Sequence, residues 1–143
     1  MNKDIYFSCS YKINSIWFIA CHEKKITFMN PIKDIIDIIS YIENNEGEAR
    51  LEIFPEPDFG VSSIRVIAYP PNQYLLTLAE YLDDGDLVVR TKLDTPYNPN
   101  LVMFDGDGEM YPSSAIIDDF DFVIKVFSIF LETGDVPYDL MDI

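Results

Sequence analysis

Hydrophobic positions recur at every second residue through the middle of the chain, which predicts β-strands. These period-two runs are rich in β-branched and aromatic residues and are separated by turn residues. They are Ala49–Phe54, Ser62–Tyr69, Gln73–Leu82 and Asp86–Leu93. Prolines interrupt the pattern between runs, and Gly85 in the last turn can adopt the positive φ of a tight hairpin. The pattern predicts an antiparallel meander with one face packed and one partly wet.

Alternation along these strands also predicts which side chains share a face. In the run Ser62–Tyr69, the apolar positions Ile64, Val66 and Ala68 alternate with Arg65. In the last run, one face carries Leu87, Val89, Thr91 and Leu93, and the other carries Val88, Arg90 and Lys92.

Two short apolar runs near the N-terminus predict a further pair of strands. Ile5–Tyr11 and Ser15–His22 are joined by a turn at residues 12–14. Both runs are apolar on both faces, which is typical of central strands in a covered sheet. Lys24–Met29 is a candidate third strand.

A helix is predicted after these strands. Asn30 suits the N-cap, and Pro31 suits the first helical position, where a missing N–H has no cost. Isoleucines then recur at helical spacing, at positions 32, 35, 36, 39 and 42, with polar residues on the opposite side. Gly47 is the predicted stop.

The segment from Asp118 to Pro137 predicts a second helix that is apolar around most of its circumference. Asp118 or Asp119 can cap it, and Gly134 followed by Pro137 can end it. Its main apolar face comprises Phe120, Val123, Ile124, Phe127, Phe130 and Leu131, widened by Phe122, Val126 and Ile129. Its polar stripe is Asp121, Lys125, Ser128 and Glu132. Such a helix must lie against the sheet and against the first helix, with only a strip in contact with water.

Together these elements predict one α+β domain over residues 1–143, a mostly antiparallel sheet of about six strands with two helices packed on one face. The high apolar and aromatic content argues against disorder. No apolar run approaches the ~20 residues of a membrane span, and the N-terminus lacks the basic and apolar regions of a secretory signal. A cytoplasmic location without membrane association is therefore expected.

Charge is the strongest global signal, with 25 acidic against 10 basic residues and a formal net charge of −15. Residues 1–81 hold 11 acids and 7 bases, a net of −4, whereas residues 82–143 hold 14 acids and 3 bases, a net of −11. Nucleic-acid binding is disfavoured because phosphate contacts need Lys and Arg. A field of this sign attracts a basic protein, or it serves solubility alone.

Candidate catalytic and metal-binding motifs are weak. Cys9 and Cys21 are two reduced, buried thiols, or a pair if adjacent strands align them. His22 beside Cys21 offers a Cys–His pair, but no spacing for a metal site is present. The run Asp105–Glu109 resembles the start of a calcium loop, yet its sixth and twelfth positions are Met110 and Ile116 instead of Gly and Glu. It therefore predicts a tight acidic turn, and no cofactor or metal is expected.

An enzyme remains an alternative. Asp105 and Asp107 could serve as acid and base if they lay in a deep cleft with Trp17 and His22. Acids in a glycine-rich turn are, however, expected to be solvated.

A family resemblance lies in the C-terminal residues 101–137. A predicted strand pair, Leu101–Phe104 and Glu109–Pro112, leads into an aspartate-capped helix that closes on Phe130, Glu132, Thr133, Gly134 and Pro137. This arrangement is similar to the closing element of small immunity proteins from bacterial polymorphic-toxin and contact-dependent growth-inhibition systems. The resemblance implies a non-enzymatic protein that binds a cognate toxin domain in the cytoplasm. Many such toxins are nucleases with a basic cleft, which an acidic binder would complement.

The residues expected to contact a partner are therefore acids in turns and the tyrosines beside them. They are Asp83, Asp84, Asp86, Asp105, Asp107 and Glu109, with Tyr81, Tyr97 and Tyr111. Aromatic residues beside charges often dominate interface energies. The alternatives are that these acids only solvate turns, or that the chain is a general acidic interaction or adaptor module. The sequence specifies neither the partner nor the oligomeric state.

Overall fold

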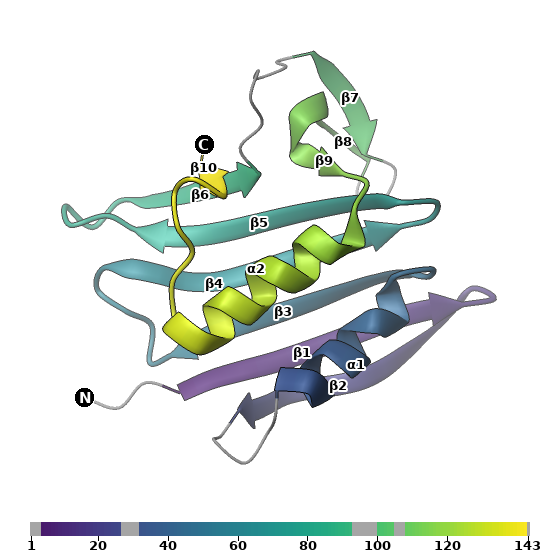
Figure 1. The fold of residues 1–143 in the computed structure, drawn as a ribbon, viewed down its shortest axis with the longest axis horizontal. Coiled ribbons are helices and arrows are strands. Elements are labelled where there is room, and N and C mark those ends of the chain that lie inside the picture. Colours follow the sequence, from purple (N-terminus) through teal and green to yellow (C-terminus); the bar gives the residue numbers. More distant parts are fainter. Residues whose placement is uncertain (1–3, 27–31, 93–99, 105–107, 143) are drawn as a thin grey trace.

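A computed structural model of the chain describes residues 4–26, 32–92, 100–104 and 108–142 (Figure 1). The main sheet has the order β10-β6-β5-β4-β3-β1-β2, and β9 also pairs with β5. Its strands are β1 (Asp4–Ile13), β2 (Ile16–Ile26), β3 (Glu46–Phe54), β4 (Gly60–Tyr69), β5 (Gln73–Tyr81), β6 (Leu87–Lys92), β9 (Ile116–Ile117) and β10 (Met141–Asp142). A separate hairpin pairs β7 (Leu101–Phe104) with β8 (Glu109–Pro112).

The helices are α1 (Ile32–Ile39) and α2 (Phe120–Thr133), with single 3₁₀ turns at Ser40–Ile42 (η1) and Ser113–Ala115 (η2). Both α-helices lie on one face of the sheet (Figure 1). Every strand pair among the described residues is antiparallel, and six strands, β1–β6, are long. The predicted α+β fold with two helices on one face of the sheet is confirmed.

Helix α2 forms as its sequence predicts. The Asp119 side chain accepts a hydrogen bond from Asp121 N at the N-cap, and Gly134 ends the helix at φ 73°. Five residues are buried, namely Phe120, Val123, Val126, Phe127 and Phe130. They share one core with the inner faces of β1 and β3–β5 and with Ile35, Ile39 and Ile42 of α1 and η1. The predicted contact of α2 with both the sheet and the first helix is confirmed.

The first helix is shorter than its isoleucine pattern predicts. α1 ends at Ile39 and tightens into η1, which buries Ile42. The predicted cap residues, Asn30 and Pro31, lie outside the described residues.

Gly47 was expected to end this helix, and that prediction is wrong. Gly47 lies inside β3, opposite Tyr11 of β1, and is buried. A Cβ at this position would lie 2.5 Å from Ser10 O and 2.6 Å from Ile42 Cγ2. The glycine is needed because η1 packs directly onto the backbone of the sheet.

Substituting Gly47 with alanine should therefore destabilise the fold by about 1–3 kcal/mol, because the methyl group overlaps backbone that cannot move freely. Urea denaturation followed by circular dichroism measures the change. The control is Glu48→Ala on the neighbouring, solvent-facing position, for which we expect a change below about 1 kcal/mol from a lost exposed ion pair. Equal effects of the two substitutions would contradict close packing at Gly47.

A second, smaller core lies on the helix-free face of the sheet. Tyr74 belongs to the main core, so its neighbour Leu75 points to the opposite face, where it packs with Phe104 and Ala115. β9 pairs with the start of β5 at these two residues. The β7–β8 hairpin and η2 therefore cover one end of β5 on this face.

The prediction that the two N-terminal strands are central is wrong for β2, which forms an edge of the sheet. Most of its side chains are exposed, including Trp17 and Ile19. Asn14 and Ser15 form the β1–β2 turn at φ 53° and 66°. Lys24–Ile26 is the end of β2 and not a third strand, and the remainder of that predicted strand lies outside the described residues.

Candidate partner-binding site

Three loops converge at one end of the sheet. They are residues 55–59 between β3 and β4, 82–86 between β5 and β6, and 134–140 between α2 and β10. The Tyr81 hydroxyl donates to Glu56 of the first loop, and Tyr138 of the third loop donates to Glu80 at 2.6 Å. A cavity of about 490 Å³ lies between Phe59–Val61 of β4 and its loop, Glu80 of β5, and Thr133–Asp135. The three loops thus form one continuous surface.

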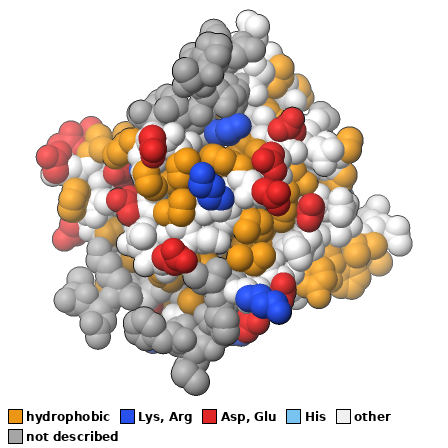
Figure 2. All heavy atoms as spheres, viewed as in Figure 1, with side chains coloured by type: hydrophobic (Ala, Val, Ile, Leu, Met, Phe, Trp, Pro, Cys, Tyr) orange, Lys and Arg blue, Asp and Glu red, His pale blue; other side chains and the backbone are white. Residues whose placement is uncertain are grey.

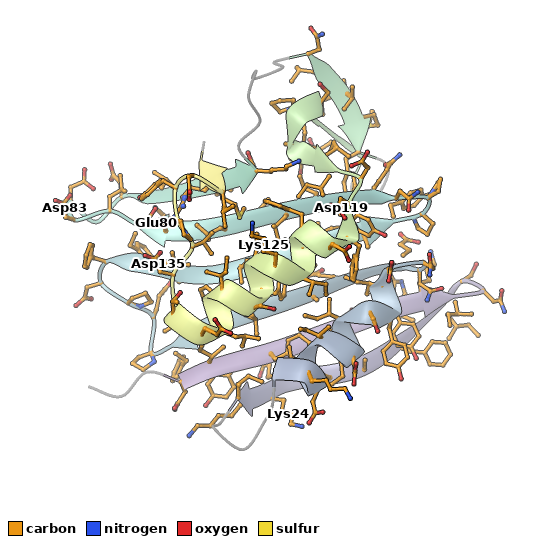
Figure 3. All side chains as sticks on the ribbon, viewed as in Figure 1. Lys24, Glu80, Asp83, Asp119, Lys125 and Asp135 are labelled. Atoms are coloured by element: carbon orange, nitrogen blue, oxygen red, sulfur yellow. The ribbon has the colours of Figure 1, made fainter. Side chains whose placement is uncertain are left out.

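This surface, here named the acidic end, is rich in carboxylates. It carries Glu56, Asp58, Asp83, Asp84, Asp86, Asp135 and Asp139. All seven side chains are exposed. Figure 2 shows acidic side chains along this side of the molecule and others on the opposite side, and Figure 3 places Glu80, Asp83 and Asp135 at the acidic end.

A buried arginine holds the third loop of the acidic end in place. Arg90 of β6 is fully buried, and its guanidinium donates to Met141 O at 2.7 Å and to Val136 O at 2.8 Å. Its Nη1 lies 3.3 Å from Glu80 Oε1, and its Cζ lies 3.8 Å from the Tyr138 ring centre. Because a guanidinium is a rigid fork of five donors, it can bind two carbonyl groups and a carboxylate together.

The inward position of Arg90 reverses the usual arrangement of polar and apolar faces on β6. Leu87 and Val89 lie on the opposite face of β6 from Arg90, as the predicted alternation places them, and both are exposed. The reason is that Val136 lies in an irregular segment and Met141 begins the two-residue strand β10, so their carbonyl groups need donors that an apolar side chain cannot supply. The burial of Arg90 also removes one of the three basic residues of positions 82–143 from the surface.

Tyrosine hydroxyls brace two of the loops through carboxylates. The hydrogen bond to Glu56 raises the pKa of Tyr81, and the hydrogen bonds to Glu80 raise the pKa of Tyr138. Both phenols therefore remain protonated donors at neutral pH. Their hydrogen bonds fix the rings beside the exposed carboxylates.

Exposed aromatic rings lie among these carboxylates. Phe54, Phe59 and Tyr138 are each more than half exposed, and all three lie at the acidic end. Phe54 and Phe59 flank the loop that carries Glu56 and Asp58. An aromatic ring surrounded by charge is the composition that interface hot spots favour.

Basic side chains form ion pairs with acids other than the seven of the acidic end. On the surface, ion pairs join Lys12 to Glu46, Lys25 to Asp4, Arg50 to Glu52 and Arg65 to Glu48. The Arg50 pair has Nε 2.7 Å from Glu52 Oε1 but off the N–H direction, so it is an ion pair without an aligned hydrogen bond. All these acids precede residue 82. Within the described ranges, none of the seven carboxylates of the acidic end has a Lys or Arg partner.

The structure brings together only part of the predicted interface. Asp83, Asp84, Asp86 and Tyr81 lie at the acidic end. Asp105, Asp107 and Tyr97 lie outside the described residues. Glu109 and Tyr111 lie on β8, and Tyr111 packs on Phe104 beside Leu75. Since Leu75 and Tyr81 are separated by six positions of β5, the β8 residues are about 20 Å from the acidic end.

Several residues of the acidic end were not predicted, namely Glu56, Asp58, Phe54, Phe59, Asp135, Tyr138 and Asp139. Their acids and aromatic rings are visible in the stretches PEPDFG and GDVPYD. What the sequence does not show is that these two stretches meet the 82–86 turn, because that proximity depends on strand order and on the Arg90 contacts.

The thiol and histidine candidates lie together on β1 and β2. Cys9 and Cys21 are directly opposite each other on β1 and β2, and both are free. Burial raises the pKa of Cys9 to about 12, which favours an unreactive thiol, and Cys21 Sγ donates to Phe7 O. A hollow of about 270 Å³ has Cys9, Cys21 and His22 in its lining together with Glu23, Glu48 and Arg50, and Trp17 is not among its lining residues. In the part of the chain that the structure describes, no group of three His, Cys, Asp or Glu side chains could hold a metal ion.

Among the helices described, none is long and apolar enough to cross a membrane.

A comparison with curated proteins found no significant match. The fold is similar to that of a crystallised hypothetical protein from Neisseria gonorrhoeae, with 21% identity, a TM-score of 0.71, and coverage of 95% of this chain and 92% of that chain. At this identity the likeness shows a shared fold. The model of a family of unknown function, DUF6911, matches residues 12–140. The chain therefore belongs to the DUF6911 family.

Proposed function

We propose that this protein is a non-enzymatic immunity protein of a bacterial toxin system, which binds and neutralises a basic toxin domain in the cytoplasm through its acidic end. The observation that carries the proposal is the convergence of seven exposed carboxylates, which have no Lys or Arg partner among the described residues, around exposed aromatic rings. Its partner would present a cationic surface, such as the phosphate-binding cleft of a nuclease.

The physical basis is complementarity of charge and shape. A local excess of carboxylates produces a potential that accelerates the encounter with a cationic partner. Affinity then depends on a few anchors, for which Phe59 and Tyr138 are suited because both rings are more than half exposed, and Tyr138 is also held by its hydrogen bond to Glu80. The internal contacts of Arg90 hold the third loop in one conformation before binding, which reduces the entropy lost on association.

Neutralising the 82–86 turn tests this proposal. The triple substitution Asp83→Asn, Asp84→Asn and Asp86→Asn should lower the association rate with the protein encoded beside this gene by about tenfold at low salt. The dissociation rate should change less, because the turn steers the encounter. Stopped-flow measurements over a range of salt concentrations separate the two rates.

A matched control is Asp34→Asn, Asp37→Asn and Asp121→Asn, which removes the same charge from exposed positions on the two helices. We expect this variant to change the association rate much less. Equal effects of the two triple variants would show that net charge alone matters, which contradicts a specific acidic end.

Growth of cells that co-express both proteins tests neutralisation. The protein encoded beside this gene should be toxic alone and harmless with this chain. Binding without toxicity would favour a general adaptor instead.

A further inference from the structure

A second unusual surface lies at the β1–β2 turn, far from the acidic end. It comprises Ile13, Ile16, Trp17, Phe18, Ile19 and Tyr41, which are 43%, 60%, 53%, 44%, 71% and 51% exposed. Figure 2 shows hydrophobic side chains gathered over this flank of the molecule. Lys12, opposite Glu46 at the start of β3, marks this end of the sheet, whereas Phe54 at the other end of β3 belongs to the acidic end. We refer to this surface as the apolar edge.

The apolar edge is held in a defined conformation. Tyr11 stacks on both Phe18 and Tyr41, with ring centres 5.6 Å and 5.1 Å away. On the other face of the hairpin, Lys12 Nζ lies 5.9 Å from the Trp17 ring centre. Aromatic rings are therefore presented on both faces of the same strand, already ordered for contact.

The backbone of this strand is also open. β2 ends the strand order, so no strand of the described residues pairs with its outer side. Natural edge strands are usually protected by charges, prolines or bulges. In β2 such features begin at Ala20, where the pairing with β1 shifts register, and they continue at Glu23, which has φ 45°, and at Lys24 and Lys25. Ile16–Ala20 has neither charge nor proline, and it is regular where it pairs with β1 at Ile16–Ile19.

Charge favours a second copy of this chain as the occupant. Two molecules with a net charge of −15 repel each other over most of their surfaces. The apolar edge contains no acid, and the rest of β2 carries one glutamate against Lys24 and Lys25. It is therefore a surface that two copies can bring together with little repulsion, whereas a basic partner would find no complement there.

The exposed apolar area is also large. Complete burial of the six residues at the exposed fractions above would cover at most about 700 Å² per copy, against the ~800 Å² per partner of a standard stable interface. Pairing of the strands would add main-chain hydrogen bonds along β2.

We propose that two copies of this chain form a dimer by antiparallel pairing of their β2 strands around a two-fold axis at Phe18. Such an axis extends the sheet across both copies and leaves all helices on one side. The axis places Phe18 opposite Phe18 of the second copy and Trp17 opposite Ile19 of the second copy. Directly opposed residues then share one face of the extended sheet. The acidic ends remain at the far ends of the extended sheet, so the dimer does not depend on the function proposed above.

Sedimentation of the full chain over a wide concentration range tests the dimer. The unmodified chain should dimerise, and Ile19→Lys should weaken dimerisation by about tenfold or more because it places a charge within the strand pair. Val89→Lys is the matched control, since Val89 is an equally apolar strand residue, 55% exposed, on β6. It should leave the dimer intact. A chain that is monomeric at all concentrations, or a dimer equally sensitive or insensitive to both substitutions, would overturn the proposal.

Cross-linking tests the geometry. Two Phe18→Cys copies paired as proposed would bring their Cα atoms within about 6 Å, which suits a disulfide. Diamide, which accepts the two hydrogens of the thiols, should therefore convert this variant to a covalent dimer. The native chain, with Cys9 and Cys21, and the Val89→Cys variant should not cross-link. A non-covalent dimer in which Phe18→Cys fails to cross-link would overturn the two-fold axis at Phe18.

Discussion

Replacing Arg90 with alanine should lower the free energy of unfolding by about 3–5 kcal/mol. The substitution leaves the Glu80 carboxylate in the protein interior without its cation, and it removes the donors to Met141 O and Val136 O. A buried polar group that loses its partner incurs its full desolvation cost. Urea denaturation followed by far-UV circular dichroism measures the loss.

Three further variants establish that the effect comes from the buried network. Arg65→Ala removes an exposed arginine with an ion pair of 3.0 Å to Glu48 and should cost below about 1 kcal/mol. Arg90→Lys should recover little stability, because an ammonium cannot reproduce the planar fork that reaches two carbonyl groups. Arg90→Met with Glu80→Gln should cost less than Arg90→Ala, since no unpaired charge remains. A cost for Arg90→Ala as small as that for Arg65→Ala would contradict a structural role.

The parts of the fold that local chemistry determines were predicted correctly. The cap at Asp119, the left-handed Gly134 and the apolar face around Phe127 all depend on residues within a few positions of one another. The hairpin turn at Gly85, with φ 91°, and the alternation of Ile64 with Arg65 are equally local. For such features the periodicity of the chain contains the necessary information.

The errors concern contacts between segments far apart in the sequence. β1 pairs with both β2 and β3, so β2 becomes an edge strand although its residues are as apolar as those of a central one. Gly47 appeared to be a helix stop because its role depends on Ser10, 37 positions away. The burial of Arg90 was not predicted, because its partners, apart from Glu80, lie in the C-terminal segment.

The candidate site was predicted in part for the same reason. The acids of the 82–86 turn are evident in the sequence. That loops 55–59 and 134–140 share a surface with this turn follows only from the sheet order and from the hydrogen bonds of Tyr81 and Tyr138. Glu109 and Tyr111 were grouped with that turn because both stretches are acidic, yet β5 separates them. The composition therefore indicated an acidic surface, and the strand order determined which residues lie on it.

Replacing Phe127 with alanine should also cost about 3–5 kcal/mol, through a cavity beneath α2. Phe127 is fully buried in the main core, on the helix face that packs against the sheet and α1. Neighbouring side chains can fill the space only partly, because α2 is fixed at both ends by Asp119 and Gly134. In thermal unfolding, the midpoint should fall by about 6–20 °C for a chain of this length.

Phe59→Ala provides the matched comparison, because it removes the same ring from a position that is 69% exposed. Its unfolding midpoint should remain within about 2 °C of that of the unmodified chain. Binding to a basic partner should nevertheless weaken, since Phe59 lies among the carboxylates of the acidic end. Phe127→Ala should instead lose stability, but at temperatures below its unfolding midpoint it should still bind the partner. Equal midpoint shifts for the two variants would contradict a core position of Phe127. Unchanged binding by Phe59→Ala would contradict a contact between that ring and the partner.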